Sequence, residues 1–128
     1  MKNIDINDYL IGINDNLRHA MKSLDESNRK ILFVIDENKK LLGTLTDGDI
    51  RRWIIKGKTL DDPVEKVCNK KPIIFIDDYS LEDIKVTMLE NRIQAIPIVN
   101  LDNKIIKILF WDDVFDSDYN FEIKGDLD

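Results

Sequence analysis

The sequence predicts an α/β fold in which two copies of one small unit pack sheet to sheet. Shifting the chain by 64 residues aligns residues 17–50 with residues 81–114 without a gap. Each copy has the pattern of a helix, two strands and a second helix. A unit of about 50 residues cannot bury both faces of its hairpin alone, whereas two packed units can. We therefore expect a pseudo-twofold module with a cleft between equivalent strands.

The repeat is one of pattern more than of identity. Apolar residues stand at equivalent places in the first helix and in both strands of each copy. The matched pairs include Leu17 and Leu81, Ala20 and Ile84, Leu24 and Met88, Val34 and Ile98, Ile35 and Val99, and Asp49 and Asp113.

The elements of the first copy follow from its periodicity. Residues 17, 20, 21 and 24 form one apolar helix face, which Asn14 or Asp15 can cap. "ILFVID" and "LLGTLT" are two strands joined by the polar turn "ENKK", and a helix follows from about Asp47 to Lys56, stopping near Gly57. The aliphatic side chains of the first strand would line a base pocket. Sequence leaves open whether these are residues 31, 33 and 35 or their neighbours Leu32 and Val34, because one residue of slip reverses every side chain.

The second copy follows a linker. We place the first repeat at residues 1–57, the linker at 58–65, the second repeat at 66–115 and an acidic tail at 116–128. Val64 to Cys68 is a candidate short helix, and "PIIFI" a candidate short strand. Ser80 and Asp83 have capping-box spacing. "IPIVN" and "KIIKILF" form the second hairpin, in which Pro97 indicates an edge strand or a strand start because it lacks an N–H.

Composition excludes several classes of function. The 128 residues are 43% apolar and carry a net charge of −6, which argues against nucleic-acid and anionic-membrane binding. Neither a signal peptide nor a membrane-length apolar run is present in the sequence. One cysteine, Cys68, and one histidine, His19, make a poor metal or nucleophile set, and a single cysteine fits a cytoplasmic setting.

The motif "GTLTDGDIRR" is the strongest candidate site. Thr46 ends a strand, and its hydroxyl can reach a ribose or phosphate oxygen. Asp49 lies one turn into the helix and can accept two hydrogen bonds from ribose hydroxyls. Gly43 permits close backbone approach, and Arg51 or Arg52 adds charge for a phosphate.

The same residues have a purely structural interpretation. Thr46 at the N-cap and Asp49 at the third helical position form a plain capping box, and Arg51 and Arg52 then belong to a solvated helix face. The spacing alone does not decide between the two.

The repeat, the linker segment "DDPVEKVCNKKPI", the strand "IPIV" and the motif "GTLTDGDI" together resemble a tandem pair of cystathionine-β-synthase (CBS) domains, a Bateman module. The resemblance covers nearly the whole chain. It implies two β-α-β-β-α repeats that bind an adenosine nucleotide of the AMP, ADP or ATP class, or a related adenosyl ligand, in the cleft between them. It also implies regulation of an attached or partner protein, and pairing into a homodimer. In the family pattern the threonine and aspartate that match Thr46 and Asp49 contact ribose and phosphate.

The motif "GTLTDGDIRR" is similar to the corresponding motif of CBS pairs that are fused to sugar-phosphate nucleotidyltransferases or to arabinose-5-phosphate-type isomerases. The resemblance therefore implies a sugar-nucleotide enzyme as the regulated partner, with the acidic tail as a connection to it. It implies no catalytic residue, metal or required cofactor in this chain.

The second copy departs from the motif. Lys107, Phe110 and Asp113 stand where the first copy has Gly43, Thr46 and Asp49. Phe110 lacks the hydroxyl, but it can stack on an adenine, fill the cleft or pack in a core or dimer interface. Phe110 and Asp113 therefore mark a second site that is at best incomplete.

Two further interpretations compete with nucleotide sensing. The pair Asp47 and Asp49 formally matches the D-x-D of haloacid-dehalogenase phosphatases, but the other strand ends of that enzyme class are missing. The remaining alternative is a structural dimerisation module that binds no ligand.

Overall fold

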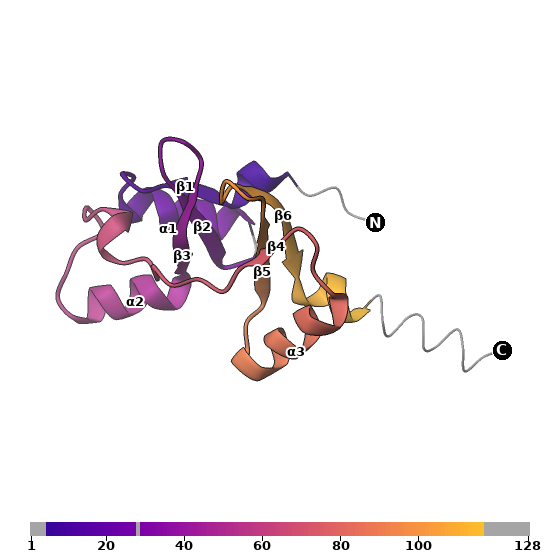
Figure 1. Cartoon of the computed structure of the whole chain (residues 1–128). Coiled ribbons are helices and arrows are strands. Elements are labelled where there is room, and N and C mark those ends of the chain that lie inside the picture. The colour runs from indigo at the N-terminus through magenta and orange to yellow at the C-terminus, as the bar shows by residue number, and fades with distance from the viewer. Residues whose placement is uncertain (1–4, 28, 117–128) are drawn as a thin grey trace. The chain divides into compact units, whose positions relative to one another are not determined.

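The computed structural model describes residues 5–27 and 29–116. Contacts divide the chain into two compact units. The first unit extends to Pro72 and includes residues 102–104, and the second contains Ile73–Leu101 and the chain from Ile105 onward. Each unit is a small α/β assembly built on one three-stranded sheet, as the repeat predicts (Figure 1).

The first unit contains the helix, hairpin and helix that the sequence predicts, preceded by a short strand. Its sheet order is β1-β2-β3, with β1 parallel to β2 and β2 antiparallel to β3. The elements are η1 (Ile6–Tyr9), β1 (Leu10–Gly12), α1 (Leu17–Ser27), β2 (Ile31–Ile35), β3 (Leu41–Thr46), α2 (Asp47–Ile55) and η2 (Val64–Lys66).

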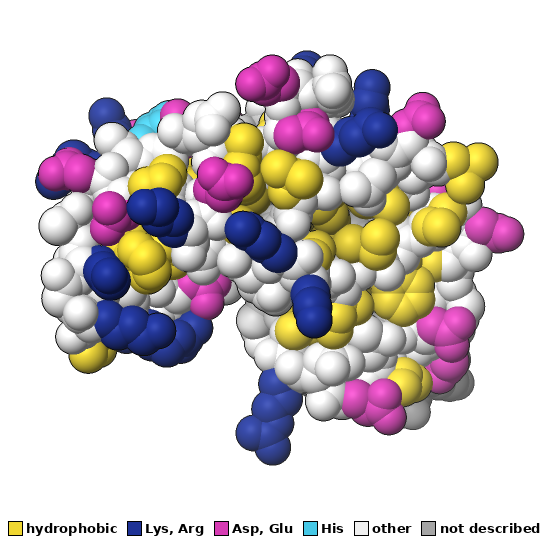
Figure 2. Space-filling view, turned by 60° about the vertical axis from the view of Figure 1, so that its left-hand side comes forward, with side chains coloured by type: hydrophobic (Ala, Val, Ile, Leu, Met, Phe, Trp, Pro, Cys, Tyr) yellow, Lys and Arg dark blue, Asp and Glu magenta, His cyan; other side chains and the backbone are white. Residues whose placement is uncertain are grey.

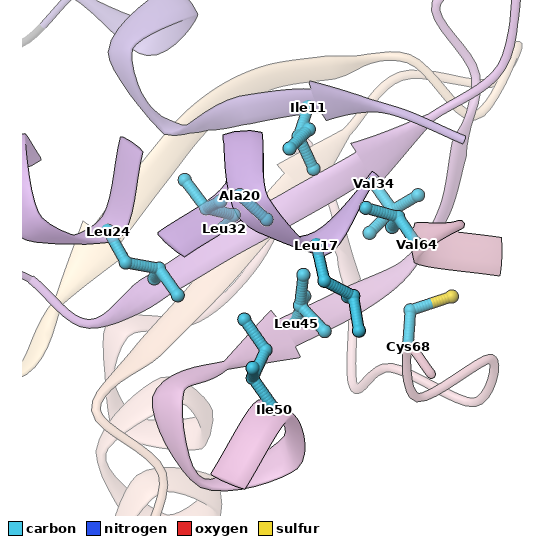
Figure 3. Close-up of a cluster of buried hydrophobic side chains, with 10 residues drawn as sticks. All are labelled: Ile11, Leu17, Ala20, Leu24, Leu32, Val34, Leu45, Ile50, Val64 and Cys68. Atoms are coloured by element: carbon cyan, nitrogen blue, oxygen red, sulfur yellow. The ribbon is translucent and has the colours of Figure 1, made fainter. Parts of the chain in front are cut away.

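The core of the first unit lies between one face of the sheet and the helices (Figure 3). Leu32 and Val34 of β2 point into it, which resolves the register that the sequence leaves open. Phe33 alternates to the other face of the strand and is fully buried there. The cluster consists of Ile11, Leu17, Ala20, Leu24, Leu32, Val34, Leu45, Ile50, Val64 and Cys68.

The segment that follows α2 is fixed to the first unit. The backbone N–H of Leu17 donates to the carbonyl of Asp62, and that of Val64 donates to Asp15 at 2.8 Å. The indole N–H of Trp53 donates to the carboxylate of Asp62 at 2.9 Å. These bonds, together with the burial of Val64 in the core, make this segment an ordered part of the unit.

The second unit repeats the architecture. Its sheet order is β4-β5-β6, with β4 parallel to β5 and β5 antiparallel to β6. The helix α3 covers the sheet with Ile84 and Met88, which pack on Ile96, Ile98 and Val114. The elements are β4 (Phe75–Ile76), α3 (Leu81–Asn91), β5 (Ala95–Val99) and β6 (Ile105–Phe110), and residues 111–116 are helical.

Two sequence predictions are wrong in detail. The cap of α1 is Asn16 rather than Asn14 or Asp15, since Asn16 Oδ1 accepts from the His19 N–H at 2.9 Å. Asp15 instead accepts from the Gly12 N–H. Pro97 lies in the middle of β5, which is the central strand. It is tolerated because the pairing of β5 with β4 starts only at Ile98, so no ladder bond on that side needs a Pro97 N–H.

The face of the described residues seen in Figure 2 carries charges of both signs together with exposed apolar side chains. None of the described helices is long and apolar enough to cross a membrane.

Candidate functional site

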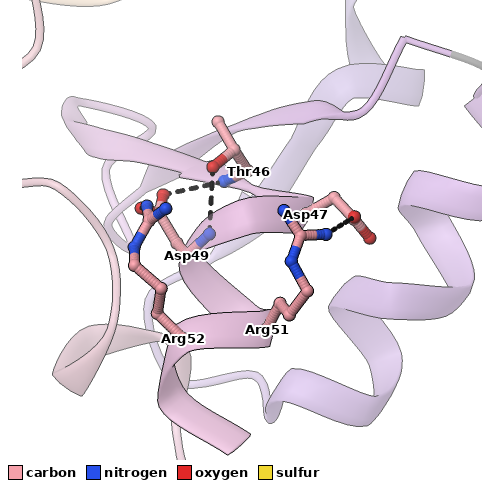
Figure 4. A network of polar contacts seen from close by, with 5 residues as sticks. All are labelled: Thr46, Asp47, Asp49, Arg51 and Arg52. Atoms are coloured by element: carbon pink, nitrogen blue, oxygen red, sulfur yellow. Dashed lines mark hydrogen bonds and ion pairs between the residues drawn. The ribbon is translucent and has the colours of Figure 1, made fainter. Parts of the chain in front are cut away.

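The candidate site lies at the junction of β3 and α2, where Thr46 is the N-cap of the helix (Figure 4). Thr46 Oγ1 accepts from the Asp49 N–H at 3.2 Å, and Asp49 Oδ2 accepts from the Thr46 N–H at 2.9 Å. The capping box that the spacing predicts is therefore formed. It holds the Thr46 hydroxyl and the Asp49 carboxylate side by side at the start of the helix.

The second oxygen of Asp49 is also engaged. Arg52 Nη2 donates to Asp49 Oδ1 at 2.7 Å, and the Asp49 side chain is 20% exposed, against 66% for Arg52. The Thr46 N–H thus binds one carboxylate oxygen of Asp49, and the exposed guanidinium of Arg52 binds the other.

Arg51 forms a second ion pair at the same helix end. Its Nη1 donates to Asp47 Oδ2 at 2.9 Å, and both side chains are largely exposed. Asp47 is not among the residues predicted to bind the nucleotide. The i, i+4 spacing of Asp47 and Arg51 is the signal that predicts this pairing.

Gly43 lies where the backbone at Asn69 passes close to strand β3. A Cβ there would lie 2.3 Å from the backbone carbonyl oxygen of Asn69. Thr44 and Asn69 exchange two backbone hydrogen bonds, with N–O distances of 3.0 and 2.8 Å. The absence of a side chain at Gly43 therefore lets the segment after η2 pair with β3, a long-range contact that the motif itself does not reveal.

The equivalent residues of the second unit are differently placed. Phe110 is 1% exposed, so its ring is part of the packed interior, whereas Asp113 is exposed. Lys107 Nζ donates to the Tyr79 hydroxyl at 3.1 Å, which raises the pKa of Lys107. The threonine hydroxyl of the first unit has no counterpart here.

Cys68 and His19, the poor metal or nucleophile set of the sequence, take no part in the hydrogen bonds described above at Thr46 and Asp49. Cys68 is buried in the core of the first unit, and that burial raises the pKa of its thiol. His19 is on the exposed side of α1, with Nδ1 3.5 Å from Asp15. It borders a hollow of about 470 Å³ that is also lined by Asn7, Asp8, Tyr9, Leu10, Ser23, Glu26 and Ser27.

Comparison with known proteins identifies the fold family. A family model described as "CBS domain" matches residues 4–56 and again residues 64–119. Arabinose 5-phosphate isomerase GutQ of Salmonella typhi is 30% identical over 86 residues, which is 67% of this chain but 27% of GutQ. The chain therefore spans about a quarter of the length of that relative.

Solved structures agree. CBSX2, whose structure is described as a complex with AMP, is 25% identical, with a TM-score of 0.75 and coverage of 88% of both chains. The CBS domain pair of MJ0100, described as a complex with 5′-methylthioadenosine and S-adenosyl-L-methionine, is 22% identical, with a TM-score of 0.76 and coverage of 87% of both chains. With two matched repeats and this fold, the chain belongs to the CBS domain family as a tandem CBS pair, or Bateman module.

Proposed function

We propose that this CBS pair is a regulatory module that binds an adenosine nucleotide, with Thr46 and Asp49 as the ribose- and phosphate-contacting residues in the cleft between the repeats. The observation that carries the proposal is the paired Thr46 hydroxyl and Asp49 carboxylate at the start of α2. CBSX2 is 25% identical to this chain with 88% of each chain covered, and its structure is described as a complex with AMP. This supports an adenosine nucleotide as the class of ligand.

The geometry explains how a capping box also serves a ligand. Thr46 Oγ1 uses a lone pair to accept from the Asp49 N–H, and the hydroxyl proton is then available for a ligand oxygen. Asp49 keeps Oδ2 on the Thr46 N–H and turns Oδ1 from Arg52 to a ribose hydroxyl. The exchange is easy, because an exposed ion pair contributes about 0–1 kcal/mol. The structural and functional interpretations of the motif are therefore compatible.

We assign at most one working site to the chain. In the second repeat, Phe110 takes the place of Thr46 and is buried, so it offers no hydroxyl and no exposed ring for stacking. Asp113 retains the carboxylate, and we regard it as insufficient without the threonine.

The regulated activity belongs to a different part of the protein or to a partner. We propose an enzyme of sugar-phosphate or sugar-nucleotide metabolism, an isomerase or a nucleotidyltransferase, acting in the cytoplasm. The similarity to GutQ, of which this chain covers 27%, supports this class of partner. In this proposal the CBS pair itself carries out no catalysis. The predicted connecting tail lies almost wholly outside the described residues.

We also propose that the module forms a homodimer. A structural dimerisation module without a ligand remains the alternative to nucleotide sensing. Leu81, Val86 and Leu89 of α3 are 50%, 44% and 56% exposed, and apolar side chains of this kind are more often buried. Sedimentation equilibrium of the chain tests this: we expect a dimer, and a monomer at all concentrations contradicts it.

The test of nucleotide binding is calorimetric titration with AMP, ATP and S-adenosylmethionine, in the wild-type chain and in Asp49→Ala. Binding of one ligand that is lost in the variant supports the proposal. Because Asp49 also caps α2, the variant must be compared at a temperature where it is folded, and Asp49→Asn serves as a second variant that retains an acceptor for the cap. If no ligand binds the wild-type chain, the module is a dimerisation element, and binding that survives both substitutions refutes the assignment to Asp49.

A further inference from the structure

The two arginines at the start of α2 converge on one point. Gly48 has no side chain, and a Cβ there would lie 3.2 Å from Arg52 Nη1 and 3.6 Å from Arg51 Nη2. Both guanidinium groups turn back toward the N-terminal end of the helix (Figure 4). The guanidinium groups of both arginines therefore lie within 4 Å of the place that a Gly48 Cβ would take, which brings two positive charges together on the first turn of α2.

Each guanidinium is held by a carboxylate that can be exchanged. Arg52 pairs with Asp49 at 2.7 Å and Arg51 with Asp47 at 2.9 Å, and the arginine side chains are 66% and 64% exposed. Exposed pairs of this kind hold their partners weakly. Phosphate is tetrahedral, but two of its oxygens can accept from a guanidinium in the same bidentate way as a carboxylate, and it carries more negative charge, so it competes well for a guanidinium.

Binding of ribose links the two exchanges. A ribose hydroxyl that donates to Asp49 Oδ1 competes with Arg52 and can displace it, because Arg52 donates to that same oxygen. With a nucleoside, the displaced guanidinium gains only water. With a nucleotide, the Arg52 guanidinium gains a phosphate next to the ribose, which compensates for the lost ion pair with Asp49.

The Arg51 guanidinium, which also lies close to Gly48, can bind a second phosphate in the same way.

We propose that this site selects adenosine ligands by their phosphates and favours those with at least two, with Arg51 and Arg52 as the specificity-determining residues. The inference rests on the proposed function at Thr46 and Asp49 and names the ligand class within it. It disfavours adenosyl sulfonium compounds such as S-adenosylmethionine, whose positive charge would face the two guanidinium groups.

The test is a calorimetric titration series with adenosine, AMP, ADP, ATP and S-adenosylmethionine at constant ionic strength, without divalent cations. The variants are Arg51→Gln, Arg52→Gln and the double variant. Arg18→Gln is the matched control, since Arg18 is a 65% exposed helix arginine paired with Asp61 at 3.3 Å elsewhere in the same unit. All four keep a polar side chain at an exposed position, so we expect them to fold.

We expect affinity to rise from adenosine to AMP to ADP. Each of the variants Arg51→Gln and Arg52→Gln should weaken ADP binding by about tenfold or more, since hydrogen bonds to charged groups are the strong ones. Adenosine affinity should change little, and Arg18→Gln should match the wild type. Equal affinity for adenosine, AMP, ADP and S-adenosylmethionine, or an ADP affinity that the arginine variants leave unchanged, overturns this inference but not the proposed function. Absence of binding by all five compounds overturns the proposed function with it.

Discussion

Substitution Gly43→Ala tests whether Gly43 is needed for the pairing of β3 with the segment after η2. The new Cβ would lie 2.3 Å from the Asn69 carbonyl oxygen, a backbone atom that cannot rotate away. Asn69 must shift, and its two hydrogen bonds with Thr44 are then lost or distorted. Two such bonds contribute about 1–3 kcal/mol together, and overpacking adds about 1–3 kcal/mol more. Against this, alanine recovers about 0.4–1 kcal/mol by restricting the unfolded chain.

The net expectation is a loss of about 1–5 kcal/mol in the free energy of unfolding, measured by urea titration followed by circular dichroism. This corresponds to a fall in Tm on the order of 10 °C for a chain of this length. Gly48→Ala is the matched control. It lies inside α2, where a Cβ meets only the flexible ends of Arg51 and Arg52, so it should be neutral or stabilising by about 0.5–1 kcal/mol. A Gly43→Ala chain as stable as the wild type would refute the reasoning.

Three other predictions concern single side chains. Thr46→Val should lose about 1 kcal/mol of stability in urea because the cap is removed, while Thr46→Ser should keep it; equal losses would contradict the cap. The indole N–H of Trp53 and the backbone N–H of Thr59 lower the pKa of Asp62 from 3.8. The ionised Asp62 carboxylate therefore stabilises the fold above about pH 4, and this stabilisation is lost as the pH falls further. The free energy of unfolding of Asp62→Asn should fall less steeply with decreasing pH than that of the wild type. An unchanged slope would contradict this. Because burial raises the pKa of Cys68, its labelling by a thiol reagent at pH 8 should be far slower than in urea, and similar rates would argue against that burial.

Local patterns predicted most of the elements. The apolar spacing of residues 17, 20, 21 and 24 predicts the buried face of α1; Leu17, Ala20 and Leu24 are buried, whereas Met21 is 40% exposed. The end of α2 near Gly57 is confirmed, since Lys56 is the C-cap and Gly57 has a φ of +86°. These features depend on residues within one or two turns of each other, which is the range that periodicity and capping rules describe.

The features that sequence reasoning missed depend on distant residues or on short elements. Strand β1 has three residues, too few to show a period, so only the family resemblance implied a strand before α1. The Gly43–Asn69 approach joins residues 26 positions apart, so nothing near Gly43 predicts it. The cap of α1 is one residue from the prediction, because Asn14, Asp15 and Asn16 are all capable caps; Asn16 accepts from the His19 N–H, while Asp15 accepts from the Gly12 N–H.

At the site, the sequence predicted the residue types and the capping box but not how the charges pair. The ion pair of Arg52 with Asp49 and the convergence of Arg51 and Arg52 over Gly48 depend on side-chain directions on the first turn of α2. Spacing alone gives such directions only approximately. This pairing changes the interpretation of Asp49 from an open carboxylate to one whose Oδ1 already accepts from Arg52.

The most direct test of the account is the location of the nucleotide on the protein. Amide ¹⁵N–¹H spectra of the labelled wild-type chain, recorded during titration with ADP, report every residue whose surroundings change. The account predicts saturable shifts of Thr46, Gly48 and Asp49, with the indole N–H of Trp53, one turn further along α2, as a nearby reporter. Saturable shifts confined elsewhere, such as the hollow beside His19, or no shifts at all, would contradict the central claim that Thr46 and Asp49 bind the ligand.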